Sequence, residues 1–392
     1  MTTSATNACN VCRAPFGTAL YRSPEGQSLT SLCRLYPSTT EVFVCAGCGH
    51  LQTRSIEHVD AFYDYDYNIL VDSEEEDQIY EMHAGAPVYR TAHQVRVLRD
   101  TLSDLASPLL LLDYGCAKSS TIRALCTQEP DIVPHLYDVS ARYEPFWEKF
   151  VPRENWAIKQ TPANWQGRFD LVTSFFSLEH IPTIADTLHH IASLMRPGGL
   201  FYAVVPNVLT NVADFVVIDH CNHFTEPSLI HLLADAGLIA ERIDDTAHRG
   251  AFVLVARKPK RSATITMSDD RAGIERVCAE LSSLANFWRD AAGRVREYER
   301  MLPRQSQVAI YGAGFYGAFL SSSLAHVERV ACYLDNNPFL HGRFFNDKPV
   351  LPPAQLPEDI GVVLIGLNPA HARRIVVDIP ALARSDLELF FL

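Results

Sequence analysis

The segment from Leu109 to Asp138 constrains the fold of this chain more than any other part of its sequence. An apolar run ends at Asp113, a loop of small residues and a short helical pattern follow, and Asp138 comes 25 positions after the first aspartate. A strand, a helix and a second strand in this order form a βαβ unit, whose strand ends meet at one edge of a parallel sheet. We therefore predict a nucleoside-binding βαβ unit.

The loop after the first predicted strand narrows the choice of nucleoside. Gly115 lets a ligand approach the backbone, and a carboxylate at Asp138 can accept hydrogen bonds from two ribose hydroxyls. The loop reads Cys-Ala-Lys-Ser-Ser rather than Gly-x-Gly-x-x-Gly, so it offers no tight cradle for a pyrophosphate. A cofactor without phosphates fits better, and we predict S-adenosylmethionine (SAM) beside Asp113, Gly115, Ala117 and Asp138.

Strand and helix patterns alternate over two long stretches of the chain, and this alternation predicts an α/β fold with doubly wound, mostly parallel sheets. A helical pattern over 270–302 separates the two stretches and ends before Pro303. We predict four parts: a cysteine-rich module over 1–60, a SAM-binding domain over 61–257, a linker and long helix over 258–303, and a Rossmann-like domain over 304–392.

Four of the ten cysteines form two Cys-x-x-Cys pairs, Cys9 with Cys12 and Cys45 with Cys48, which are separated by 32 residues. Two such pairs can complete one tetrahedral site with four thiolates, and no open position is left for catalysis. We predict a structural zinc ion. The alternative is a set of unrelated buried thiols.

Composition sets limits on location and partners. The net charge is −12, with ordinary hydrophobic content, and there is no basic-then-apolar leader and no run of 18 apolar residues. We expect a cytoplasmic protein that binds a small molecule rather than nucleic acid or a membrane. The oligomeric state stays open.

Two later motifs, FDLVTSFFSLEHI at 169–181 and LMRPGGLFYAVVPN at 194–207, match late motifs of known enzymes closely. Together with the Leu109–Asp138 unit, they resemble the class I SAM-dependent methyltransferases. The resemblance implies that Gly115 lies next to the methionine part of SAM and that Asp138 binds its ribose. It also places Ser177, Glu179 and His180 at the cofactor.

The whole chain resembles the three-domain sugar-nucleotide C-methyltransferases of deoxysugar biosynthesis. The matching pieces are NACNVC, YPSTTEVFVCAGCGHLQ, FYDYDYN, DHCNHF, YGAGFYG, YLDNNPFLHGRFF and VLIGLNP. The family has a zinc module, a SAM domain and a Rossmann-like domain that helps to hold the substrate nucleotide. The predicted substrate-binding residues are Tyr65, Asn207, Gly312, Gly314 and Asp335.

The resemblance implies methyl transfer to the carbon next to the ketone of a dTDP-linked 4-keto-deoxysugar. An adjacent carbonyl acidifies that C–H bond, a general base removes the proton, and the enolate attacks the methyl group. His220 matches the family's catalytic histidine and Asp219 its neighbouring glutamate, while Val217 stands where the family has a tyrosine. We group His223 and Tyr67 with the catalytic residues.

Three other functions remain open. The chain could methylate oxygen or nitrogen of a sugar or another metabolite. The Gly312-x-Gly314-x-x-Gly317 sequence, with Asp335 as a ribose-binding acid, would by itself suggest an NAD-dependent sugar-nucleotide reductase, but no obvious Tyr-x-x-x-Lys pair follows it. A scaffold that has lost SAM binding is the third alternative.

Overall fold

The computed structural model describes residues 8–24, 27–54, 56, 76–83, 86–102, 107–261, 265 and 270–392. Contacts between Cα atoms divide the chain into two compact units that alternate along the sequence. The first unit takes 1–18, 43–210 and 220–279, and the second takes 19–42, 211–219 and 280–392. The domain boundaries at 60, 257 and 303 stay predictions.

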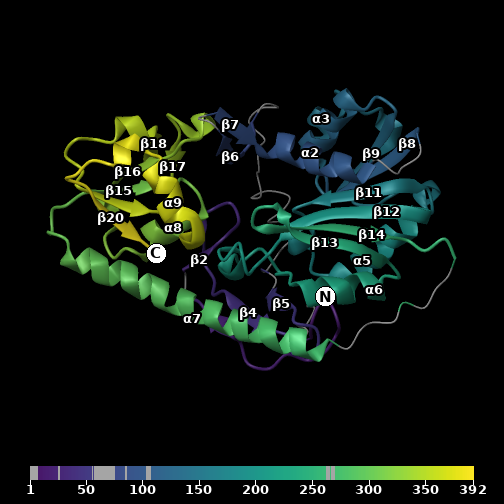
Figure 1. The fold of residues 1–392 in the computed structure, drawn as a ribbon, viewed down its shortest axis with the longest axis horizontal. Helices are drawn as coiled ribbons and strands as arrows, with labels where there is room; N and C mark the ends of the chain where they lie inside the picture. The colour runs from purple at the N-terminus through teal and green to yellow at the C-terminus, as the bar shows by residue number, and fades with distance from the viewer. Residues whose placement is uncertain are drawn as a thin grey trace. The chain divides into compact units, whose positions relative to one another are not determined.

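The first unit is built around a seven-stranded sheet with the order β10-β9-β8-β11-β12-β14-β13 (Figure 1). The five strands from β10 to β12 are parallel, and β14 is antiparallel to both β12 and β13. This mixed sheet confirms the α/β fold predicted for the central domain. The strands are β8 (Leu109–Tyr114), β9 (Ile132–Asp138), β10 (Trp156–Ile158), β11 (Phe169–Phe175), β12 (Met195–Pro206), β13 (Ile239–His248) and β14 (Ala251–Arg257).

Helices cover both faces of this sheet, which explains why its central strand is apolar at consecutive positions. Leu111 packs in one hydrophobic cluster with residues of α2 and α3. Leu112, the next residue, belongs to the opposite cluster with residues of α5 and α6 (Figure 1). The helices are α2 (Arg90–Leu102), α3 (Ser120–Gln128), α4 (Glu144–Trp147), α5 (Ile184–Leu194) and α6 (Glu226–Asp235).

The second unit contains a six-stranded sheet with the order β17-β18-β16-β15-β19-β20. Its strands are parallel except for β17, which pairs antiparallel with β18. The arrangement is Rossmann-like. The elements are β15 (Val308–Tyr311), α8 (Phe315–Ser323), β16 (Val330–Leu334), β17 (Phe344–Phe345), β18 (Lys348–Leu351), β19 (Val362–Ile365), α9 (Pro369–Val377) and β20 (Glu388–Phe391).

Helix α7 (Arg271–Met301) has 31 residues and confirms the long helix predicted over 270–302. Short strands dominate the described residues before α2. They are β1 (Tyr21–Arg22), β2 (Ser28–Leu29), β3 (Leu35–Tyr36), β4 (Glu41–Val44), β5 (Leu51–Thr53), β6 (Ile79–His83) and β7 (Ala86–Tyr89).

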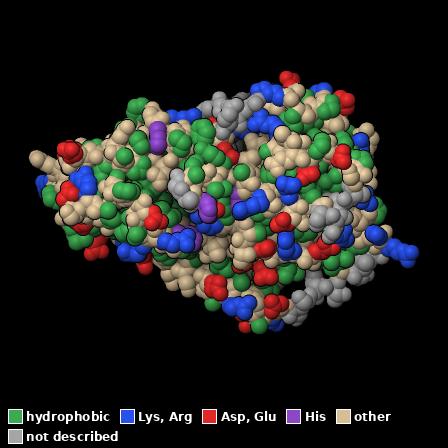
Figure 2. Space-filling view, turned by 45° about the horizontal axis from the view of Figure 1, so that its top comes forward, with side chains coloured by type: hydrophobic (Ala, Val, Ile, Leu, Met, Phe, Trp, Pro, Cys, Tyr) green, Lys and Arg blue, Asp and Glu red, His purple; other side chains and the backbone are tan. Residues whose placement is uncertain are grey.

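Among the helices that the structure describes, none has both the length and the apolar character needed to cross a bilayer. Acidic and basic side chains are interspersed over the face drawn in Figure 2.

Candidate functional site

The loop after β8 brings two predicted cofactor residues together. Gly115 has a φ of +68°, and its backbone N–H donates to the carbonyl oxygen of Tyr137 on β9 at 2.8 Å. A Cβ atom added to Gly115 would lie only 2.2 Å from Oγ of Ser177. The glycine is therefore required both by its backbone conformation and by the close approach of Ser177.

Asp113 lies on β8, two residues before Gly115, and is almost fully buried. Its carboxylate accepts hydrogen bonds from the Ser119 hydroxyl at 2.6 Å and from the Thr173 hydroxyl at 2.9 Å, so it ties the loop to β11. Burial raises the pKa of Asp113 to about 7, although both hydroxyls favour the charged form.

Asp138, at the end of β9, holds the other side of the loop. Its two carboxylate oxygens accept from the backbone N–H groups of Ala117 at 2.8 Å and Ser140 at 2.9 Å. Each oxygen keeps a second lone pair, so the carboxylate can still accept from ribose hydroxyls. Ala117 and Ser119 adopt φ angles of +45° and +54°, a region that normally favours glycine.

The structure places two residues predicted for the cofactor beside the predicted base. Glu179 and His180 lie on the short helix η5 (Leu178–His180), directly after β11. The rings of His180 and His220 meet edge to face with centroids 4.6 Å apart. One ligand atom from each of Glu179, His180 and His220 lies within 4.8 Å of the other two. Sequence reasoning had kept these residues in separate groups.

The other two catalytic candidates that the structure describes, His223 and Asp219, form hydrogen bonds with residues of the N-terminal segment. His223 is fully buried, and its Nε2 atom is 2.7 Å from the Thr53 hydroxyl. Asp219, in the second unit, accepts from both the backbone N–H and the hydroxyl of Ser31, each at 2.6 Å. These contacts anchor the segment on both sides of His220. Tyr65 and Tyr67 lie outside the described residues.

The four predicted zinc ligands form one cluster. Their Sγ atoms all lie within 4.8 Å of one another, with Cys9 and Cys48 separated by 3.7 Å and Cys12 and Cys45 by 3.4 Å. These separations are far above the ~2.0 Å of a disulfide. They are near the ~3.8 Å edge of a tetrahedron with Zn–S bonds of about 2.3 Å. The donor set fits zinc.

Sequence reasoning missed Asn222, which links the cysteine cluster to η5. Its side-chain oxygen accepts from Nδ2 of Asn10 at 3.0 Å and contacts Nε2 of His50 at 3.2 Å. Its amide nitrogen donates to the carbonyl oxygens of Leu178 and Ile181 at 3.1 and 2.8 Å. Its place between two candidate histidines, His220 and His223, was the only signal in the sequence.

The second unit repeats the glycine–carboxylate arrangement of the first. Gly312 has a φ of +106°, and the Asp335 carboxylate accepts from the backbone N–H groups of Ala313 and Asn337, each at 2.8 Å. The glycine and the aspartate are 23 positions apart in both units, from 115 to 138 and from 312 to 335. No heavy atom lies within 4 Å of a Cβ built on Gly314.

Asn207, the remaining substrate candidate, is buried at the end of β12. Its side-chain oxygen accepts from the backbone N–H of Leu209 at 3.0 Å, and its backbone N–H donates to the carbonyl oxygen of Gly250.

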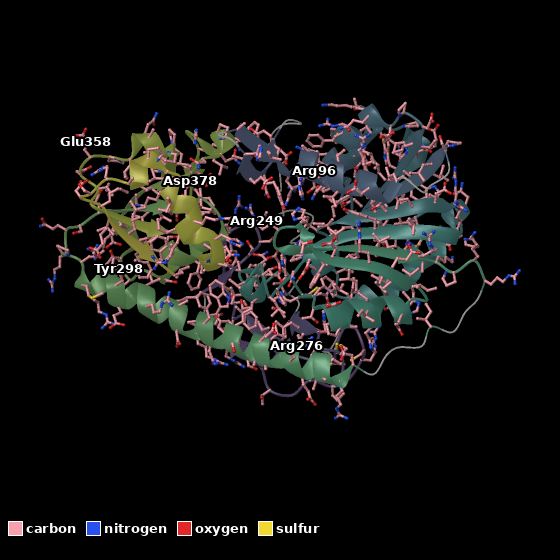
Figure 3. The ribbon with its side chains drawn as sticks, in the orientation of Figure 1. Arg96, Arg249, Arg276, Tyr298, Glu358 and Asp378 are labelled. Carbon is pink, nitrogen blue, oxygen red and sulfur yellow. The ribbon has the colours of Figure 1, made fainter. Side chains whose placement is uncertain are left out.

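The ring of Tyr80 stacks on that of His93, whose Nδ1 accepts from Arg96 at 2.9 Å. Arg96 and Arg249, which contacts Tyr80, are labelled in Figure 3.

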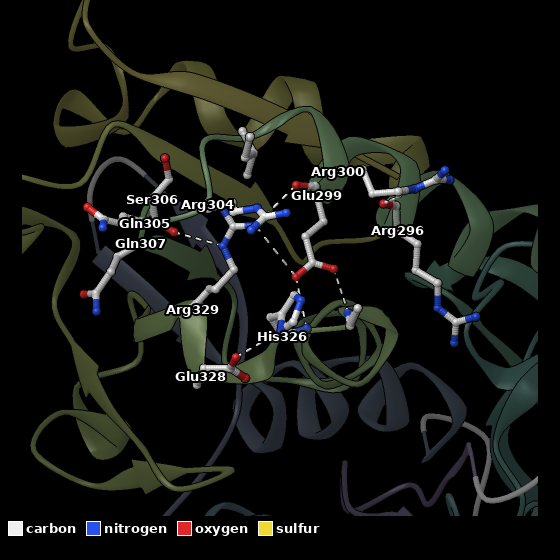
Figure 4. Close-up of a pocket in the computed structure, with 12 residues that line it drawn as sticks. Arg296, Glu299, Arg300, Arg304, Gln305, Ser306, Gln307, His326, Glu328 and Arg329 are labelled. Atoms are coloured by element: carbon white, nitrogen blue, oxygen red, sulfur yellow. Dashed lines mark hydrogen bonds and ion pairs between the residues drawn. The ribbon is translucent and has the colours of Figure 1, made fainter.

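A cavity of about 1120 Å³ lies in the second unit at the end of α7 (Figure 4). None of the residues predicted as functional lines it. Glu299 accepts from the backbone N–H groups of Ala325 and His326, and Arg329 donates to the carbonyl oxygens of Ser306 and Glu299. The bonds of Glu299 fix the end of α7 to the segment between α8 and β16.

Comparison with known protein families identifies the central part of the chain. Residues 89–241 match the model of a family described as a methyltransferase domain. The matched range holds β8 to β12, the loop at Gly115 and η5.

The central domain has the class I SAM methyltransferase fold.

One curated relative is similar to part of this chain. The ubiquinone biosynthesis O-methyltransferase of Aeromonas salmonicida is 28% identical over 126 residues, which cover 28% of this chain. The chain spans only half the length of that relative.

Solved structures are similar over less than half of the chain. A SAM-dependent methyltransferase from Mesorhizobium loti has a TM-score of 0.35 and 16% identity, covering 42% of this chain and 98% of its own. The 1,6-didemethyltoxoflavin-N1-methyltransferase of Burkholderia thailandensis has a TM-score of 0.34 and 19% identity, covering 43% and 80%.

Proposed function

We propose that the protein transfers the methyl group of SAM to the carbon next to the ketone of a nucleotide-linked 4-keto-deoxysugar, with His220 as the base. One observation carries this proposal. The η5 segment, whose sequence motif lies at the cofactor in class I methyltransferases, contacts the His220 ring through His180. A base is thus held next to the part of the domain that carries the methyl donor.

The residues around His220 suit proton transfer. SAM, when bound, supplies an electrophilic methyl group. His220 takes the proton from the substrate carbon, and the ring of His180 limits its rotation. The Glu179 carboxylate, within 4.8 Å of both rings, stabilises the imidazolium that forms. Burial excludes water from the carboxylate and strengthens that interaction.

The remaining parts of the chain support this substrate class. The arrangement of Gly312 and Asp335 in the second unit suits a nucleoside, and we assign the substrate nucleotide to it. We assign a structural zinc ion to the four cysteines. We place the protein in the cytoplasm.

The base assignment is tested with His220→Asn. We expect turnover with SAM and a dTDP-4-keto-deoxysugar to fall at least a hundredfold, while the Kd for SAM measured by calorimetry changes less than twofold. Exposed His189, on α5, gives the matched control His189→Asn, which should retain full turnover. Wild-type turnover in the His220 variant would exclude this base.

Methylation of oxygen is a second candidate, because the curated relative is an O-methyltransferase. His220 could equally deprotonate a hydroxyl. Mass spectrometry and NMR of the product formed with methyl-labelled SAM would show whether the label sits on carbon or oxygen. A label on oxygen would replace the first proposal with the second.

A further inference from the structure

The side chain of Asn222 is fully buried and uses all of its hydrogen-bonding groups. An amide offers two acceptor positions on oxygen and two N–H donors. Here the oxygen faces two donors from the cysteine-rich segment, and the nitrogen faces two carbonyl oxygens around η5. The backbone N–H of Asn222 also donates to the carbonyl oxygen of Glu179 at 3.0 Å.

The partners on the oxygen side lie within or just after the two Cys-x-x-Cys pairs. Asn10 lies between Cys9 and Cys12, and His50 follows Cys48 by two positions. The Asn222 oxygen accepts at Nε2 of His50, 3.2 Å away, so this bond requires the proton on Nε2. The conformation of the two Cys-x-x-Cys segments therefore sets the positions of the two N–H groups that face the Asn222 oxygen.

The partners of the Asn222 nitrogen lie on either side of Glu179 and His180 in the sequence. Leu178 and Ile181 flank Glu179 and His180, and Asn222 itself follows His220 by two positions. The thiol of Cys221 reinforces the same link by donating to the carbonyl oxygen of Glu179. One amide thus sets the distance between η5 and the His220 segment.

We infer that Asn222 is a positioning residue through which the cysteine module holds His220 against His180 and Glu179. The inference rests on the proposed function in treating His220 as the reacting base. It changes the role of the cysteine module: the metal site supports the geometry of methyl transfer through two hydrogen bonds, in addition to stabilising its own segment.

Two substitutions separate the two sides of the link. Asn10→Ala removes one of the two donors to the Asn222 oxygen and leaves all four cysteines in place. Asn222→Asp keeps an acceptor for Asn10 and His50 but directs a carboxylate oxygen at the carbonyl oxygens of Leu178 and Ile181, which separates η5 from the loop. Asn155→Ala, at the end of the short helix Arg153–Asn155, is the control.

We expect Asn10→Ala to lower kcat fivefold to tenfold, the range for one lost hydrogen bond. The KM for SAM should stay within twofold, and zinc content should be unchanged. Asn222→Asp should lower kcat more than a hundredfold. Asn155→Ala should match the wild type. A purely structural role would instead lower thermal stability with kcat of the folded fraction intact, and that result would overturn the inference.

A second readout does not depend on turnover. Ring signals of His220 and His180, followed by NMR in protein labelled at histidine and loaded with zinc, should shift in Asn10→Ala and stay fixed in Asn155→Ala. If wild-type protein fails to methylate any keto sugar nucleotide, the proposed function fails and these signals still decide the inference. Unchanged signals in Asn10→Ala would overturn it.

Discussion

Single residues decide whether the cofactor loop can form. Gly115→Ala adds a Cβ in a left-handed conformation and places it 2.2 Å from the Ser177 hydroxyl. The backbone term costs about 1–2 kcal/mol, and the collision forces Ser177 away from the loop. We expect SAM affinity, measured by calorimetry, to fall more than tenfold.

Gly167 provides a matched control for this substitution. Its φ is +65°, close to that of Gly115, but no heavy atom lies within 4 Å of an added Cβ. Gly167→Ala should therefore lower the free energy of unfolding by the cost of the left-handed backbone alone, with SAM affinity unchanged. Equal losses of SAM affinity in the two variants would contradict a local role for the approach to Ser177.

The buried carboxyl group of Asp113 makes stability depend on pH. Its pKa of about 7 lies above the ordinary value of 3.8, so the folded state favours the protonated form. Its contribution to stability is complete below pH 4 and is lost as pH rises through 7. A difference of three units corresponds to about 4 kcal/mol as an upper bound.

Asp113→Asn removes this titration and keeps an acceptor for one hydroxyl. We expect the variant to gain stability relative to the wild type as pH rises from 4 to 8.5, measured by urea denaturation at each pH. A stability difference that does not vary with pH would show that Asp113 titrates near its ordinary value.

At the scale of elements, most of the central fold follows from the sequence. The apolar run at 109–114, the acidic residue near the end of each strand and the helical spacing over 270–302 predicted β8, β9 and α7. Local periodicity determines such elements. The same reasoning covers the cysteine cluster, because doubled Cys-x-x-Cys pairs bring their own ligands together.

Contacts between distant segments could not be predicted in this way. The meeting of His180 with His220 joins residues 40 positions apart, and the bond between Asn222 and Asn10 joins residues 212 apart. No local pattern encodes such pairs. The left-handed backbone of Ala117 and Ser119 could not be predicted either, because that conformation is expected at glycine rather than at alanine or serine.

For the whole molecule, the cysteine cluster should hold one zinc ion per chain. We expect Cys45→Ser to release it, since three thiolates and a hydroxyl bind zinc far more weakly. Elemental analysis of purified protein would measure the metal. Cys33→Ser is the matched control, because the Cys33 thiol lies outside the cluster and donates to the carbonyl oxygen of Ser31. Zinc retained in the first variant would contradict the site.

The alternation of the two units along the chain has a consequence for biosynthesis. Residues 19–42 belong to a unit whose main sheet is encoded by residues 280–392. At ribosomal rates of about 5–20 residues per second, the early segment waits roughly 20 to 70 seconds until its partners have been synthesised. During that interval its apolar side chains remain available to chaperones, and the second unit cannot fold until residues 280–392 have been synthesised.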